Sequence, residues 1–96
     1  MSNEKEITSL LSSRDIQLKV LINEVIILTD KNGKDYWIIK TNSGKDYFAF
    51  SADWHLTHQT LSILVNCSEM LKGRWATLTI RERKGHEKVI SIQLEK

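Results

Sequence analysis

Histidine, carboxylate and thiol side chains are the first candidates for chemistry in this sequence. Asp53, His55 and His58 lie close together along the chain, and two histidines three residues apart share one face of a helix. A zinc site requires three or four protein ligands, whereas His86 and Cys67 lie elsewhere in the sequence. We therefore predict neither a metal site nor a bound cofactor, and we interpret Asp53 as a helix N-cap.

The sequence also lacks the motifs of common enzyme classes. It has no phosphate-binding glycine-rich loop, no nucleophile elbow and no His-Glu-x-x-His pair. Cys67 lies among Ile63, Leu64 and Met70, which predicts a small buried side chain and not an accessible nucleophile. We therefore expect a protein without catalytic activity.

Aromatic and basic side chains suggest a different chemistry, the binding of a single-stranded nucleic acid. Such a site needs cations to neutralise phosphates and flat rings on which bases stack. Residues 72–88 contain six lysines and arginines against two glutamates, whereas the whole chain has a net charge of only +2. The alternative interpretation is a solvated hairpin with cross-strand ion pairs, which contribute little to stability.

Length and composition indicate one globular domain. Ninety-six residues leave no room for a second core, and 41% hydrophobic with 27% charged residues is ordinary for a folded protein in water. One cysteine cannot form an internal disulfide, and the N-terminus does not resemble a signal peptide. The most apolar stretch, residues 18–28, is too short and too polar to span a membrane. We expect a cytoplasmic protein without a membrane partner.

The glycines mark the turns between the predicted strands. Asn32-Gly33 lies between two β-branched runs and predicts a hairpin with a type I′ turn. Gly44 and Lys84-Gly85 indicate two further hairpin tips. A change of phase at Asn23-Glu24 predicts a bulge or bend in the long first strand. The predicted strands are 16–29, 36–41, 47–52, 74–83 and 88–94.

The interval between the third and fourth strands predicts a helix over residues 54–72, ended by Gly73. Its core stripe consists of Leu61, Leu64, Val65, Ser68 and Leu71. Residues 1–15 form an N-terminal segment for which either a short helix or a frayed end is consistent with the spacing of Ile7, Leu10 and Leu11.

Strand alternation assigns side chains to the core or to the surface. In the fourth strand Ala76, Leu78 and Ile80 are expected in the core, with Trp75 on the outward face. The other interpretation of Trp75 is that the helix or the N-terminal segment covers it. Trp37 and Trp54 are expected in the core, with Tyr36 outward. In the third strand Phe48 and Phe50 alternate with Tyr47, and we assign Tyr47 to the outward face.

This order of three strands, a helix and two strands, with a long bent first strand, resembles the OB-fold, a five-stranded Greek-key barrel. The resemblance covers residues 16–96, a single domain, and rests on element order and on stretches such as Tyr47 to Phe50 and Leu71 to Ile80. An SH3-like barrel would not accommodate so long a helix, and a β-grasp fold usually places its helix after two strands. The resemblance names no family.

OB-folds bind oligonucleotides or oligosaccharides on strands two and three and on the adjoining loops. By this resemblance we predict a non-catalytic module for single-stranded DNA or RNA. The residues expected to bind the nucleic acid are Lys34, Tyr36, Lys40, Tyr47, Trp75, Arg81, Arg83 and Lys84.

The predicted helix supports an alternative function. Outside its core stripe it also contains Leu56, Ile63, Cys67 and Met70, so its apolar surface is wider than one buried face requires. The alternative is therefore an interaction or assembly module that uses this surface or an edge strand to bind a partner protein or to form a homodimer.

Overall fold

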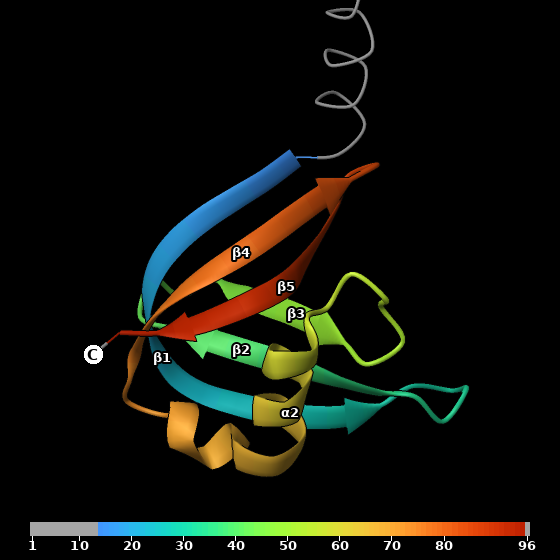
Figure 1. Cartoon of the computed structure of the whole chain (residues 1–96), viewed down its shortest axis with the longest axis horizontal. Coiled ribbons are helices and arrows are strands. Elements are labelled where there is room, and N and C mark those ends of the chain that lie inside the picture. The colour runs from blue at the N-terminus through green and yellow to red at the C-terminus, as the bar shows by residue number, and fades with distance from the viewer. Residues whose placement is uncertain (1–13, 96) are drawn as a thin grey trace, which may run out of the picture.

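The computed structural model describes residues 14–95, which fold into five antiparallel strands and two short helical elements (Figure 1). The strands are β1 (Arg14–Thr29), β2 (Asp35–Thr41), β3 (Asp46–Phe50), β4 (Trp75–Arg83) and β5 (His86–Leu94). The helix α2 (His58–Cys67) and the 3₁₀ helix η1 (Ser68–Leu71) lie between β3 and β4 along the chain. This element order is the one predicted from the sequence, and residues 1–13 lie outside the described part.

The long strand β1 belongs to both halves of the sheet. Its first half, as far as Leu21, pairs with β4, and its second half pairs with β2. The register with β2 shifts between Ile22 and Glu24, which confirms the predicted bend. Figure 1 shows the consequence: β1 curves from its blue start beside β4 to its teal end beside β2.

The sheet is open, with the strand order β3-β2-β1-β4-β5. Within residues 14–95 no ladder joins β3 to β5, so the predicted closed barrel is not confirmed. The helix start uses part of the edge of β5: the backbone N–H of Thr57 donates to the Ile90 carbonyl at 2.9 Å, and the Ile92 N–H donates to the buried Thr60 hydroxyl at 3.0 Å. These backbone groups of β5 are therefore unavailable to β3.

One core fills the space between the two halves of the sheet. The predicted inward residues of β4 are almost fully buried, and so are Trp37 and Ile39 of β2. Both form one cluster with Leu64 of α2 and Leu71 of η1. Because β4 and β2 lie on opposite sides of β1, this cluster unites both halves of the sheet and the helical segment.

Two predicted core assignments are wrong, and each has a structural cause. Trp54 is 85% exposed, because it lies in the loop before α2 and not inside the helix. Val65 is also exposed, since α2 buries only a narrow stripe that includes Leu64. The helix cap differs as well: the side chain of Thr57 accepts from the backbone N–H of Thr60 at 3.2 Å, and Asp53 lies outside the helix.

The hairpin turns differ in detail from those predicted. Gly33 has a positive φ, but Asn32 does not, so this hairpin has no type I′ turn. The Gly33 N–H donates to the Asp30 carbonyl at 3.0 Å, and the Asp30 N–H donates to the Lys34 carbonyl at 2.8 Å, a pattern typical of a type I turn followed by a bulge. Both turn residues have positive φ at Lys84-Gly85, the two-residue tip between β4 and β5.

Candidate nucleic-acid interface

The structure divides the eight predicted binding residues among several surfaces. Trp75 and Arg81 lie on the outward face of β4, at its two ends. Tyr36 and Lys40 lie on the outward face of β2, two strands away. Three further predicted residues are exposed cations: Lys34 in the turn between β1 and β2, Arg83 at the end of β4, and Lys84 at the tip between β4 and β5.

Tyr47 is not on the outward face of β3. Only 7% of its surface is exposed, and it belongs to the core cluster. The inward row of the sheet explains this phase: Trp37 pairs with Ala49, and both are buried. A small residue opposite the large indole complements it in the core, so Ala49 faces inward. Because side chains alternate along a strand, Tyr47 faces inward as well, and Phe48 and Phe50 face outward.

Arg81 is engaged by a carboxylate of its own chain. Its Nε and Nη2 donate to the two oxygens of Asp15 on β1, at 2.8 and 3.1 Å. This hydrogen bond lowers the pKa of Asp15 and raises that of Arg81, in each case against a smaller effect of burial. Trp75 is 45% exposed but lies at the other end of β4. Arg83 lies at the same end of β4 as Arg81. The outward face of β4 therefore does not place a ring beside a free cation.

Aromatic and aliphatic side chains instead gather on the outward face of β1, β2 and β3. We call this the apolar face, and define it as two rows of paired residues: Leu28, Tyr36 and Phe50, then Ile26, Ile38 and Phe48. The ring of Phe50 lies 5.8 Å from that of Tyr36 and 6.4 Å from that of Phe48, at interplanar angles of 24° and 14°. Phe48 and Phe50 are each 37% exposed. Three rings are thus aligned on a surface that is not part of the core.

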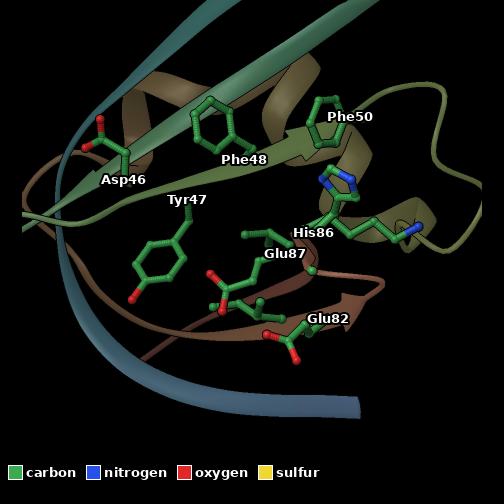
Figure 2. Close-up of a pocket in the computed structure, with 11 residues that line it drawn as sticks. Asp46, Tyr47, Phe48, Phe50, Glu82, His86 and Glu87 are labelled. Carbon is green, nitrogen blue, oxygen red and sulfur yellow. The ribbon is translucent and has the colours of Figure 1, made fainter. Parts of the chain in front are cut away.

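A groove of about 520 Å³ runs beside the apolar face, between β3 and the β4–β5 hairpin. Phe48 and Phe50 form one wall, and His86 and Glu87 form the other (Figure 2). Its volume falls within the roughly 300–1,000 Å³ of small-molecule sites. The groove lies where β3 and β5 do not pair, so it is a direct consequence of the open sheet.

Lysines neutralise two of the carboxylates at this groove. Lys45 Nζ lies 2.9 Å from Glu87 and 5.3 Å from the centroid of the Tyr47 ring. The hydrogen bond to Glu87, and then its charge, raise the pKa of Lys45. Lys40 Nζ donates to Asp46 at 3.2 Å, which closes the end of the apolar face with an ion pair.

A polar cluster around the buried side chain of Asp53 lies at the other end of the groove. Lys88, which lines the groove, donates to Asp53 Oδ1 at 2.8 Å and to His55 Nδ1 at 3.1 Å. Burial alone would raise the pKa of Asp53, but hydrogen bonds from Lys88 and from the His55 backbone N–H outweigh it, so the pKa is lowered. The Lys88–Asp53 pair connects the loop before α2 to β5.

Phe48, Phe50 and Trp54 are surface aromatics that the sequence analysis did not assign to the site. The pairing of Trp37 with Ala49 could have placed the two phenylalanines outward, because a large and a small residue complement each other across an inward row. For Trp54, no local pattern distinguishes a loop residue from the first turn of a helix.

Comparison of the chain with protein-family models, with curated proteins and with solved structures finds no match in any of the three. In residues 14–95, neither helical element is long and apolar enough to cross a bilayer. The same residues contain no group of three or more histidine, cysteine or carboxylate side chains that could hold a metal ion.

Proposed function

We propose that this protein is a non-catalytic module that binds single-stranded DNA or RNA across the apolar face and the adjoining groove. The observation that supports this most directly is the aligned, exposed set of Tyr36, Phe48 and Phe50 rings. Bases stack on such rings with about 1–3 kcal/mol per base, and with little dependence on sequence. Of the predicted residues, the proposed site keeps Tyr36 and Lys40, replaces Tyr47 by Phe48 and Phe50, and leaves out Trp75 and Arg81, which lie on the outward face of β4.

The strand order supports an OB-like assignment of this surface. A long bent β1 shared between β2 and β4, with the helical segment between β3 and β4, is the arrangement expected of an OB-fold. In that fold the ligand lies on strands two and three, between the loops that join strands one to two and four to five. The apolar face and the groove occupy this position here.

Exposed cations flank the proposed path of the strand. Lys31 and Lys34 lie in the β1–β2 hairpin, and Arg83 and Lys84 lie at the β4–β5 tip. Within residues 14–95 none of these four forms a salt bridge, so each is available to a phosphate. Binding should weaken steeply with added salt, because neutralised phosphates release counterions.

The test is a fluorescence anisotropy titration with labelled single strands of about 12 nucleotides, a length within the site size of an OB-fold. DNA, RNA and a duplex are compared at low and high salt. Phe48→Ala and Phe50→Ala should each weaken single-strand binding by roughly 5- to 150-fold, the loss of one stacked base. Val65→Ala, an exposed apolar residue on α2, serves as the control and should leave the affinity unchanged. If the wild-type protein binds no single strand at low salt, the proposal is wrong.

The same surface supports a second candidate, an interaction or assembly module. Six apolar side chains in two adjacent rows are also typical of a protein-docking surface, and the groove contains the carboxylates of Asp46, Glu82 and Glu87, which oppose a polyanion. The apolar helix surface, which the sequence suggested for this function, is smaller than predicted. Leu56 is buried and Ile63 packs on the core, so of these residues only Met70 is well exposed. Light scattering that shows a dimer, lost in Phe48→Ala, would favour this candidate.

A further inference from the structure

Trp54 is the most exposed large apolar side chain of residues 14–95, at 85%. It lies in the loop between β3 and α2, four residues after Phe50. One side of its indole faces the ring of His55, with centroids 4.0 Å apart and planes tilted by 32°. So exposed a ring buries little surface on folding, which gives it almost no role in the core.

The loop that contains Trp54 is held by internal contacts. The Asp53 side chain is only 4% exposed, and its Oδ1 accepts from the His55 N–H at 3.0 Å and from Lys88 at 2.8 Å. The backbone adds two turns: the Asp53 N–H donates to the Phe50 carbonyl, and the Leu56 N–H donates to the Asp53 carbonyl, both at 3.1 Å. Trp54 is therefore presented from a fixed backbone.

The chemistry of this cluster favours positioning over stability. Removing an ion pair from water costs free energy that the attraction between the charges seldom exceeds, so apolar residues would stabilise such a loop equally well. Hydrogen bonds are directional, and those of Asp53 Oδ1 with the His55 N–H and with Lys88 hold the Asp53–His55 segment in one orientation. Lys88 of β5 and Phe50 at the end of β3 both line the groove. The loop that carries Trp54 follows Phe50 in the chain and is bound to Lys88, which places the anchored loop at the Phe50 end of the groove.

We propose that Trp54 is an additional base-stacking residue, and that the Lys88–Asp53–His55 cluster positions its ring at the Phe50 end of the groove. A single-stranded nucleic acid bound across the apolar face would then stack its next base on the Trp54 indole, beyond Phe50. This inference rests on the proposed function, and it extends the site from β2 and β3 to the β3–α2 loop. Asp53 and Lys88 are positioning residues in this scheme, and the ligand class is a single-stranded nucleic acid.

Trp54→Ala tests the stacking role in the same anisotropy titration. We expect the affinity for the single strand to fall about five-fold or more, as for the loss of one stacked base. Trp75→Ala is the matched control, because it removes another exposed tryptophan, but from the start of β4, and it should change the affinity less than two-fold. A normal affinity in Trp54→Ala, or a larger loss in Trp75→Ala, would overturn the inference.

Asp53→Asn separates positioning from simple electrostatics. Loss of a carboxylate makes the surface more positive and leaves Lys88 without its partner, so charge alone predicts tighter binding to a polyanion. Positioning predicts weaker binding, and no further loss when Asp53→Asn is added to Trp54→Ala. Tighter binding, or full additivity of the two losses, would refute the positioning role. Thermal denaturation verifies that each variant is folded at the temperature of the titration.

The outcomes distinguish this inference from the proposed function. If Phe48→Ala weakens binding and Trp54→Ala does not, the nucleic-acid site stands and the inference fails. If the wild-type protein binds no single strand, both fail. If Trp54→Ala instead converts a dimer to a monomer in light scattering, the ring belongs to a protein interface, and the inference is again wrong.

Discussion

Asp53 and Asp15 are two carboxylates that each bind a cation but differ in burial. The Asp53 side chain is 4% exposed and that of Asp15 is 45% exposed. The pKa is lowered in both, against burial at Asp53 and chiefly by the Arg81 hydrogen bond at Asp15. A carboxylate whose pKa is lower in the folded state contributes stability above its unfolded pKa of about 3.9, and this stability disappears as the pH falls through the folded pKa.

We predict that Asp53→Asn lowers the free energy of unfolding at pH 7 by about 1–3 kcal/mol, because a buried charge-assisted hydrogen bond is lost. Asp15→Asn should cost less than about 1 kcal/mol, as expected of an exposed ion pair. Urea denaturation measured between pH 7 and pH 3 checks both values. The difference between wild type and Asp53→Asn should stay constant above about pH 5 and shrink below about pH 4. A difference independent of pH over this whole range would contradict the assignment.

At the scale of the element, the β4–β5 tip is a two-residue turn in which Lys84 has a φ of 53° and Gly85 a φ of 81°. The left-handed region costs a residue with a Cβ about 1–2 kcal/mol, and asparagine tolerates it better than lysine. A Cβ at Gly85 would meet no atom within 4 Å, so the cost of a substitution there is that of the backbone alone.

We therefore predict that Gly85→Ala destabilises the protein by about 1–2 kcal/mol, whereas Lys84→Asn stabilises it by a few tenths of a kcal/mol. Thermal denaturation measures both. Lys84→Asn also removes one cation from the proposed site. The plot of log affinity against log salt concentration should therefore become less steep, by the amount that corresponds to about one phosphate contact. An unchanged slope would place Lys84 outside the nucleic-acid path.

The elements also show which features sequence reasoning can predict. The strands and the bend of β1 could be predicted from the alternation of apolar residues and its change of phase, because a strand with one buried face leaves that local pattern. The positions of the turns could be predicted from the glycines, because a positive φ favours glycine. The start of α2 was not predictable in this way: it depends on Thr57 and Thr60 binding the edge of β5, a contact between distant segments. The phase of β3 has the same origin, since it depends on which residue lies opposite Trp37. The candidate site depends on that phase, which is why Tyr47 was assigned to the outward face in place of Phe48 and Phe50, whereas Tyr36 on β2 was assigned correctly.

At the scale of the whole molecule, β1 makes the two halves of the sheet one cooperative unit. Its first half pairs with β4 and its second half with β2, and one core cluster contains side chains from both sides. Neither half has a separate core to retain when the other unfolds. The open gap between β3 and β5 does not divide the molecule, because it lies at the outer edges of the sheet and not between β1 and its neighbours.

We therefore predict a single two-state unfolding transition. Ile39→Ala in β2 and Leu78→Ala in β4 remove fully buried side chains from opposite halves, and each should lower the free energy of unfolding by about 2–5 kcal/mol. In urea, tryptophan fluorescence and far-ultraviolet circular dichroism should give coincident transitions for the wild type and both variants. Val65→Ala, at an exposed site on α2, should cost less than about 0.5 kcal/mol and controls for general effects of substitution. If one half retained its structure while the other melted, the two probes would separate in Ile39→Ala or in Leu78→Ala, and the bent strand would then connect two independent sheets.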